Sequence, residues 1–239
     1  MNRDPCAFFS FAANPEVSGN TFYFEHSLVK QGFSLVAGVD EAGRGPLAGP
    51  VVAGCVILPF DCEHHRFKDS KKLTARKRDE LFDYLHICGA RIGVSVVDAR
   101  EIEHLNILQA SLLAMKRAVH DCMEGTGNPL PDFLLVDGTF TVPLALPQQT
   151  LTKGESKSAS IAAASIIAKV TRDRLMAGYH EQFPVYNFLQ NKGYPTRNHR
   201  LAIAEHGPCR LHRRTFKGVR EFIKTTPEAE NTPEQRRLW

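Results

Sequence analysis

A glycine-rich turn between two apolar runs is the feature that most constrains the fold of this chain. The runs cover residues 35–40 and 51–58, and a third apolar run covers residues 91–97. Their small and β-branched residues are typical of buried strands. A shorter run, residues 133–136, ends at Asp137 and predicts one more strand. The first three predicted strands precede most of the predicted helices.

Helices are predicted to follow these strands. They are expected from Thr74 toward Cys88, from Asn106 with Gln109 in a capping-box-like start, and from Ser156 to about Gln182, closed by Pro184. In the second helix a core-facing stripe is predicted at helical spacing: Leu108, Leu112, Met115 and Val119. This order of elements predicts an α/β domain in which helices cover a mixed sheet.

The composition argues against a membrane-spanning protein and against a disulfide scaffold. The chain of 239 residues is 43% hydrophobic and 23% charged, which suits one globular domain. No stretch approaches the roughly 18 apolar residues of a spanning helix. The apolar run at residues 6–13 is short and follows Asp4 and Pro5, so no cleaved signal peptide is predicted. The six cysteines form no C-x-x-C pair, so reduced thiols in a cytoplasmic protein are expected.

Basic residues gather in two clusters, although the net charge of +4 is only mildly positive. The first cluster contains Lys68, Lys71, Lys72, Arg76, Lys77 and Arg78, and the second contains Arg197, His199, Arg200, Arg210, His212, Arg213, Arg214 and Lys217. Each cluster alone is as consistent with a solvated helix face as with a phosphate-binding track. The phosphate track is favoured if a carboxylate metal site lies nearby.

Carboxylates stand at the ends of two predicted strands. Asp40 and Glu41 end the first run, before the turn Gly43-Arg44-Gly45, and Asp137 ends another run. Neighbouring side chains of a strand point to opposite faces, so Asp40 and Glu41 share a site only if the strand ends or twists there. Adjacent strands would bring Asp40 and Asp137 together, and carboxylate oxygens suit Mg²⁺ or Mn²⁺. The ordinary alternatives are an acidic strand end and a turn aspartate before Gly138.

Several motifs together resemble one enzyme family. They are residues 38–46 (GVDEAGRGP), 69–73 (DSKKL), 106–108 (NIL), 136–138 (VDG), the block 153–173, and residues 192–196 (KGYPT) followed by 212–216 (HRRTF). With them the chain resembles ribonuclease HII of the bacterial type, a type 2 ribonuclease H. The resemblance implies a ribonuclease H-like mixed sheet flanked by helices, with a C-terminal helical segment, in a catalytic domain of residues 34–224. Residues 1–33 would be a short packed extension of unassigned role, and residues 225–239 a disordered tail.

The resemblance also implies an endonuclease with a carboxylate metal site. Asp40, Glu41 and Asp137 would bind two divalent ions, Mn²⁺ or Mg²⁺, with Glu155 as the fourth catalytic carboxylate. The family usually has aspartate where Glu155 stands, and the extra methylene lengthens the side chain by roughly 1.5 Å. Glu155 is therefore expected to bind with an altered metal preference. Asp173 is the alternative fourth ligand, although a surface ion pair also explains it.

The implied substrates are RNA/DNA hybrids and duplex DNA with embedded ribonucleotides, cut on the 5′ side of the ribonucleotide to leave 3′-OH and 5′-phosphate ends. Gly43, Arg44 and Gly45 would contact the ribose 2′-OH, which distinguishes RNA from DNA. Tyr194 would stack on the sugar 3′ of the scissile phosphate, unless it is an ordinary buried tyrosine. Asn191 replaces a histidine frequent in relatives, so a contact from that position is not assigned. The expected phosphate contacts are Lys71, Lys72, Ser165, Arg213 and Arg214.

Other activities and partners stay open at this point. A resolvase or exonuclease of the same fold would share the carboxylates without needing the 43–45 turn and Tyr194. A non-catalytic hybrid-binding protein is conceivable because of Glu155. The terminal peptide Gln235–Trp239 resembles peptides that bind bacterial sliding clamps, against the alternative of a frayed terminus. A monomer is expected.

Overall fold

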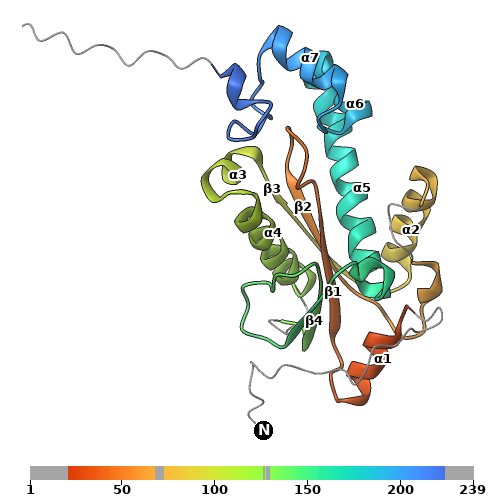
Figure 1. Cartoon of the computed structure of the whole chain (residues 1–239). Coiled ribbons are helices and arrows are strands. Elements are labelled where there is room, and N and C mark those ends of the chain that lie inside the picture. The colour runs from red at the N-terminus through yellow and green to blue at the C-terminus, as the bar shows by residue number, and fades with distance from the viewer. Residues whose placement is uncertain (1–20, 68–72, 126, 128–129, 224–239) are drawn as a thin grey trace, which may run out of the picture.

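The computed structural model describes residues 21–67, 73–125, 127 and 130–223. Its strands form one mixed sheet in the order β3-β2-β1-β4-β5 (Figure 1). The strands are β1 (Val36–Ala42), β2 (Val51–Ile57), β3 (Arg91–Val97), β4 (Phe133–Asp137) and β5 (Gln148–Leu151). β1 pairs antiparallel with β2 and parallel with β4. The antiparallel β2–β3 pair and the parallel β4–β5 pair complete the sheet.

Helices cover both faces of this sheet. They are α1 (Tyr23–Lys30), α2 (Ala75–Ile87), α3 (Ala99–Leu105), α4 (Ile107–Cys122), α5 (Ala159–Gln182), α6 (Phe188–Asn191) and α7 (Arg197–His206). Figure 1 shows α4 and α5 on opposite sides of the sheet, with α6 and α7 beyond one end of it. The predicted α/β architecture of a mixed sheet flanked by helices, with a C-terminal helical segment, is confirmed.

Strand glycines let α5 lie unusually close to the sheet. A Cβ atom added to Gly38 would lie 2.1 Å from the carbonyl carbon of Ser160, and one added to Gly54 would lie 2.5 Å from the carbonyl oxygen of Ala164. Both distances are too short for any side chain, so these positions accept only glycine. The alanines at 162–164 complete this close contact from the helix side. The first turns of α5 are thereby fixed against β1 and β2.

Two local predictions need correction. The long helix is capped by Ser158, whose hydroxyl accepts a hydrogen bond from the Ile161 amide, and Gly154–Ser156 forms a separate 3-10 turn. Sequence alone could not decide between two serines two residues apart. In α4, Met115 and Val119 are buried as predicted, but Leu108 and Leu112 are only partly buried. The buried face of α4 is instead made largely of small residues, including the alanines at 110, 114 and 118, because they allow close approach to the sheet.

Residues 21–33, assigned from sequence to an extension, pack onto the domain. Phe22 and Leu28 are fully buried. The Glu25 carboxylate accepts hydrogen bonds from the Ser158 hydroxyl at 2.6 Å and from the Ser160 amide at 3.0 Å. Glu25 therefore places a carboxylate at the N-terminus of α5, where exposed amides favour negative charge.

The C-terminal helices rest on the loop that follows β1. Leu47 and Ala48 share an apolar cluster with Phe188 and Ile203, and Met176 of α5 closes it. His212 forms an isolated antiparallel bridge with Ala48. None of the described helices is long and apolar enough to cross a lipid bilayer.

Candidate active site

Asp40 and Asp137 lie side by side where two parallel strands stop pairing. The last pair between β1 and β4 is Val39 with Val136, and the two aspartates are the next residue of each strand. Because Val39 and Val136 belong to the core cluster under α4, strand alternation turns both aspartates toward α5. The sheet register thus brings together the two carboxylates that the sequence placed on adjacent strands.

Glu155 joins them from the 3-10 turn between β5 and α5. The Gly154 amide donates to Asp137 Oδ1 at 2.6 Å, which holds this turn against the end of β4. A Cβ atom on Gly154 would lie 2.6 Å from Ile161 Cδ1, so the turn has no room for a side chain there. The Ser165 hydroxyl, on α5, donates to Glu155 Oε2 at 3.0 Å. Glu155 is thereby oriented by the helix whose position the strand glycines fix.

Glu41 reaches the same site although it follows Asp40 directly. β1 continues to Ala42, paired with Val52 of β2, so the strand does not end at Asp40. Only the pairing with β4 ends there, and beyond the effect of burial the charge of Asp137 acts on the Glu41 carboxylate and raises its pKa. The Glu41 amide donates to Asp40 Oδ1 at 2.7 Å, and Glu41 Oε1 lies 3.2 Å from an Arg44 guanidinium nitrogen.

The four carboxylates act on one another electrostatically. Burial raises the pKa of Asp40 well above its ordinary value, and the charges of Glu41, Asp137 and Glu155 raise that pKa further. Burial also raises the pKa of Glu41, while Arg44 lowers it and Asp137 raises it again. Asp40 is only 5% exposed. The site therefore concentrates negative charge in a place where water solvates it poorly.

A divalent cation would relieve this repulsion, and the donor set suits a hard cation because every contributing group is a carboxylate. Among the described residues no three acidic, histidine or cysteine side chains already stand together as a metal-ligand group. The chemistry of the donors nevertheless fits a divalent cation.

A glycine turn borders the carboxylates. Gly43 has φ +102°, a conformation that disfavours any side chain, and an added Cβ would lie 2.2 Å from Arg172 Nε. At Gly45 an added Cβ would meet only Tyr194 Cε1, at 3.9 Å. The turn thus packs tightly against Arg172 on one side and opens toward Tyr194 on the other.

Two fully buried arginines hold the backbone of this turn. Arg172 donates to the carbonyl oxygens of Pro50 at 2.9 Å, Lys192 at 2.9 Å and Ala48 at 3.2 Å. Arg213 donates to the carbonyls of Gly49 at 3.0 Å and Arg44 at 2.8 Å, and to that of Gly43 at 2.5 Å. Burial lowers the pKa of Arg213 to about 9, so the side chain stays charged near neutral pH. These six hydrogen bonds of the two guanidinium groups all go to backbone carbonyls.

The expected phosphate contact from Arg213 is therefore wrong. This side chain is fully buried, and its guanidinium is committed to three carbonyls. His199 and His212, counted in the same basic cluster, are also fully buried. Arg214, the next residue, is exposed, and its backbone amide donates to Glu103 at 2.8 Å. Of this pair only Arg214 lies at the surface of the structure.

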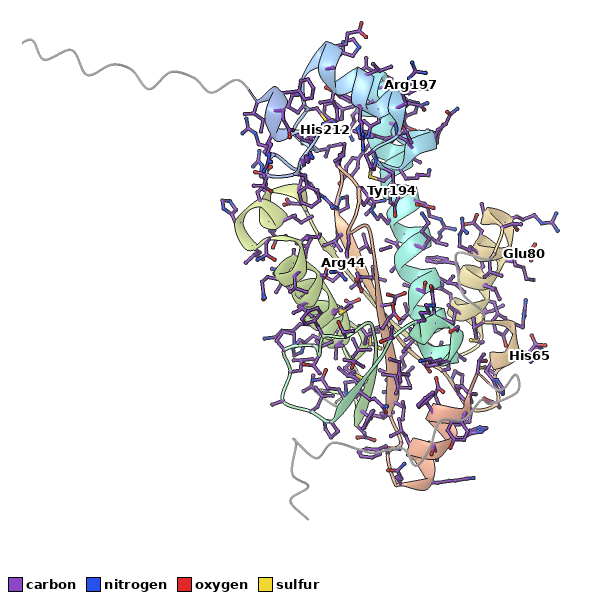
Figure 2. All side chains as sticks on the ribbon, viewed as in Figure 1. Arg44, His65, Glu80, Tyr194, Arg197 and His212 are labelled. Carbon is purple, nitrogen blue, oxygen red and sulfur yellow. The ribbon has the colours of Figure 1, made fainter. Side chains whose placement is uncertain are left out.

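Tyr194 is 41% exposed, so the alternative of an ordinary buried tyrosine does not hold. The Arg172 guanidinium carbon lies 5.8 Å from the centre of its ring. Asn191, a buried residue three positions before Tyr194, donates to the Tyr186 carbonyl at 2.6 Å and accepts from the Gly193 amide at 2.8 Å. Asn191 therefore shapes the turn that carries Tyr194. Arg44 and Tyr194 are labelled near one another in Figure 2.

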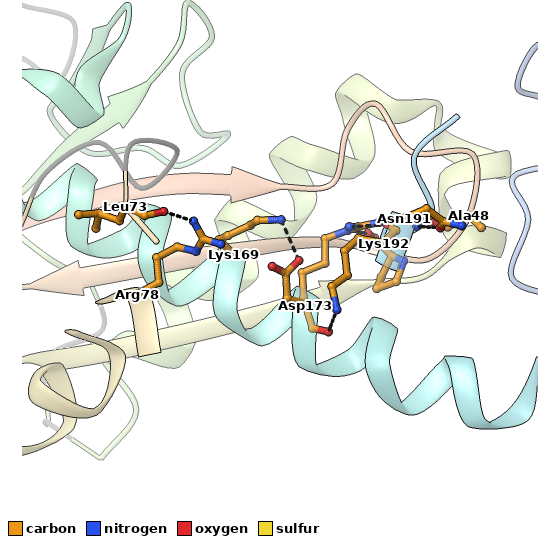
Figure 3. Close-up of polar contacts among 10 residues, drawn as sticks. Ala48, Leu73, Arg78, Lys169, Asp173, Asn191 and Lys192 are labelled. Atoms are coloured by element: carbon orange, nitrogen blue, oxygen red, sulfur yellow. Dashed lines mark hydrogen bonds and ion pairs between the residues drawn. The ribbon is translucent and has the colours of Figure 1, made fainter. Parts of the chain in front are cut away.

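Asp173 is engaged elsewhere. Its carboxylate pairs with Lys169 one turn earlier on α5 at 2.8 Å, and its carbonyl accepts from Lys192 Nζ at 3.4 Å (Figure 3). The carboxylates that raise the Asp40 pKa are Glu41, Asp137 and Glu155. The geometry thus favours Glu155 over Asp173 as the fourth carboxylate.

Two of the expected phosphate contacts, Lys71 and Lys72, lie outside the described residues. Ser165 is 5% exposed and bonds Glu155, which places it inside the carboxylate site. Sequence reasoning missed Arg172, which it treated as a neighbour of a surface aspartate. Since Arg172 is followed directly by charged residues at 173 and 174, the only available signal was its spacing from the buried small residues of α5.

Comparisons with known proteins agree with one another. The family model of ribonuclease HII matches residues 37–219. A ribonuclease HII of Desulfotalea psychrophila is 55% identical over 209 residues, covering 87% of this chain and 92% of the relative. The ribonuclease H2 of Pyrococcus horikoshii superposes with a TM-score of 0.65 at 26% identity, over 79% of this chain and 97% of the other. The ribonuclease HII of Archaeoglobus fulgidus, solved as a complex with PCNA, superposes with a TM-score of 0.63 at 25% identity, over 77% and 96%.

Proposed function

The chain belongs to the ribonuclease HII family, endonucleases that cleave the RNA of RNA/DNA hybrids, and from that premise we propose that it also cuts duplex DNA 5′ of single embedded ribonucleotides. Cleavage by hydrolysis leaves 3′-OH and 5′-phosphate ends. The observation that carries the proposal is the carboxylate group around Asp40, set beside a glycine turn that opens toward Tyr194.

Asp40, Glu41 and Asp137 would hold two divalent ions, Mn²⁺ or Mg²⁺, with Glu155 as the fourth carboxylate. When bound, such ions lower the pKa of a water molecule and neutralise charge on the leaving oxygen. Arg44 balances part of the charge on Glu41, to which it is paired. Ser165 orients Glu155 by donating to it, so we assign it to the carboxylate site in place of a phosphate contact.

The turn at residues 43–45 is suited to recognising a ribose 2′-OH. The buried Arg213 draws the backbone carbonyls of Gly43 and Arg44 inward. Inward carbonyls leave other backbone groups of the turn available to a ligand, and the 2′-OH both donates and accepts. The half-exposed ring of Tyr194, opposite Gly45, would stack on the next sugar, 3′ of the scissile phosphate.

Cleavage of defined duplexes tests this function. Wild-type protein with Mg²⁺ or Mn²⁺ is expected to cut a DNA duplex containing one ribonucleotide at a single site, 5′ of that ribonucleotide, and to leave an all-DNA duplex intact. Cutting of the all-DNA duplex would favour a resolvase or exonuclease of the same fold. Retained binding without cleavage in either ion would make the protein a non-catalytic hybrid binder.

Substitution of Glu155 tests the fourth carboxylate. Glu155→Asp shortens the side chain by about 1.5 Å, so the ratio of kcat in Mn²⁺ to kcat in Mg²⁺ is expected to change. The matched control, Asp173→Glu, changes length by the same amount at the ion pair with Lys169 and should leave this ratio alone. An unchanged ratio in Glu155→Asp would remove Glu155 from the metal-binding set.

We also propose a sliding clamp as a partner of the peptide Gln235–Trp239, which lies outside the described residues. The support is the peptide's pattern and the Archaeoglobus fulgidus ribonuclease HII solved with PCNA. Deleting residues 235–239 is expected to abolish clamp pull-down while preserving cleavage; unaltered pull-down would reject the idea. Function as a monomer in the cytoplasm stays a prediction.

A further inference from the structure

Two histidines that the proposed chemistry does not use are buried next to the backbone of Tyr194. His199 lies on α7 and His212 in the segment that follows it, and both are fully buried. The Tyr186 ring packs edge-on against His212 at 4.6 Å between centroids, and the Phe188 ring packs edge-on against His199 at 5.5 Å. Figure 2 labels His212 and Tyr194 in the same part of the molecule, at the end where α6 and α7 lie.

Their hydrogen bonds define the proton on each ring. The Cys209 amide donates to His212 Nδ1 at 3.0 Å, so His212 carries its proton on Nε2. That nitrogen lies 3.1 Å from His199 Nε2. His199 Nδ1 lies 2.8 Å from the Tyr194 carbonyl oxygen, which can only accept, so His199 carries its proton on Nδ1. Donors and acceptors therefore match in one direction from Cys209 to Tyr194.

We call the hydrogen bonds from the Cys209 amide through His212 and His199 to the Tyr194 carbonyl the histidine relay. The relay requires both imidazoles to be neutral. A proton on His212 Nδ1 would face the Cys209 amide, and a proton on His199 Nε2 would face the N–H of His212. Burial lowers the pKa of both rings, that of His212 to about 4, and each ring is thus neutral near pH 7. The titratable groups that face the pair are Cys209 and Tyr186, and burial raises the pKa of both, which keeps them uncharged as well.

Together with backbone hydrogen bonds, the relay connects the turn that carries Tyr194 with the glycine turn at residues 43–45. His212 is bridged to Ala48, a few residues after Gly45. The Leu47 amide donates to the Gly193 carbonyl at 2.8 Å, directly before Tyr194. The Tyr194 carbonyl accepts from the Thr196 amide at 2.8 Å as well as from His199. Both turns are therefore tied to the 209–213 segment, and the imidazole pair is a side-chain connection in addition to those made by Arg172 and Arg213.

We propose that His199 and His212 are positioning residues for Tyr194, setting the separation between its ring and Gly45 and thereby the preference for deoxyribose 3′ of the cut. The inference rests on the proposed stacking role of Tyr194. The relay acts only through Tyr194, and no contact of either histidine with substrate is involved.

Paired variants of His199 separate positioning from packing. His199→Asn keeps a donor near the Nδ1 position and hence the bond to the Tyr194 carbonyl, whereas His199→Leu loses it; both variants lose the bond to His212. The readout is the ratio of kcat/KM for a single-ribonucleotide DNA duplex to kcat/KM for an RNA/DNA hybrid. His199→Leu should lower this ratio by about tenfold, because small misplacement of a positioning group is costly. His199→Asn should lower it by less, about threefold, because it keeps the bond to the Tyr194 carbonyl and loses only the bond to His212.

A double-mutant cycle with Tyr194→Ala decides whether His199 acts by positioning Tyr194 or only by packing in the core. If the relay acts through Tyr194, His199→Leu will lower the ratio in wild-type background but will add nothing in Tyr194→Ala. Equal losses in His199→Asn and His199→Leu, or the full loss persisting in Tyr194→Ala, would overturn the proposal.

Failure of the proposed function gives a different pattern. If wild-type protein cleaves the single-ribonucleotide duplex and the RNA/DNA hybrid with equal kcat/KM, the sugar-selection role of Tyr194 fails. The double-mutant cycle is then evaluated from kcat/KM for the hybrid alone. If nothing is cleaved, ¹⁵N NMR of the imidazoles at pH 7 decides: protons on His199 Nδ1 and His212 Nε2 support the relay, and any other tautomer pair or a charged ring refutes it.

Discussion

At the scale of single residues, Arg213 explains most about how the glycine turn is built. Its guanidinium is fully buried and donates to three backbone carbonyls, while its neighbour Arg214 is exposed. Buried carbonyls without a donor each cost about 1–3 kcal/mol. The turn therefore depends on the fork-shaped arrangement of the Arg213 nitrogens and not on its charge alone.

Arg213→Lys should destabilise the fold and slow cleavage. Lysine keeps the charge but cannot reach all three carbonyls, so the free energy of unfolding should fall by about 2 kcal/mol or more. Urea denaturation and cleavage of the single-ribonucleotide duplex measure the two effects. Arg214→Lys is the matched control one residue away, and it should stay within about 0.5 kcal/mol of wild type. Equal effects of the two substitutions would mean that the carbonyl contacts of Arg213 are unimportant.

Sequence reasoning found the carboxylates of the site but not the arginines that shape it. Asp40 and Asp137 were predictable because each ends an apolar run of the sequence, and the ends of such runs on adjacent strands lie close together. Arg172 and Arg213 stand in charged stretches that have the composition of a surface. Their burial depends on carbonyl oxygens distant in sequence, such as those of Pro50 and Gly43, and no local pattern encodes such contacts.

At the scale of elements, the contact between α5 and the sheet sets the position of Ser165 and hence of Glu155. β2 contributes Gly54, which leaves no space between the strand and the carbonyl of Ala164. The predicted strands were found because they are apolar runs, and the predicted helices were found largely because Thr74, Asn106 and Pro184 mark their ends. β5 was missed because it reads Gln-Gln-Thr-Leu and is only partly buried, so it does not form an apolar run.

Gly54→Ala should displace α5 and impair the site from a distance. The new methyl group would lie 2.5 Å from the Ala164 carbonyl oxygen, so the helix must move, at a cost of about 1–3 kcal/mol. Thermal unfolding and single-turnover cleavage should both report the change. Gly178→Ala lies in the same helix with nothing within 4 Å of the new methyl group, and it should stabilise by about 0.5–1 kcal/mol. Full activity and stability in Gly54→Ala would contradict the packing described here.

At the scale of the whole molecule, segments far apart in the chain come together at two opposite ends of the domain (Figure 1). Glu25, from α1, binds the start of α5, and the 209–213 segment binds the turn after β1. The buried pair His199 and His212, beside the 209–213 segment, is expected to make the stability of the protein depend on pH. Burial lowers the folded-state pKa of His212 to about 4, whereas its ordinary value is 6.5.

Below about pH 6.5 the unfolded chain therefore binds a proton at this position that the folded protein does not bind. The free energy of unfolding should fall as the pH drops from 6.5 toward 4, by up to about 1.4 kcal/mol per pH unit for this group. Asp40 and Glu25, with raised pKa values, act in the opposite direction. The contribution of His212 is thus measured as the difference in slope between wild type and His212→Gln, which cannot titrate. Parallel slopes would show that His212 is not held neutral.

The most direct test of the whole account is single-turnover cleavage of a DNA duplex with one ribonucleotide by Asp40→Asn, with Asp173→Asn as the control. Asp40 is the carboxylate on which the other three act, so its loss should slow cleavage by at least about a thousandfold while the protein stays folded. Asp173→Asn breaks only the pair with Lys169 and should cleave at close to the wild-type rate. Cleavage by Asp40→Asn at the wild-type rate would contradict the assignment of the active site.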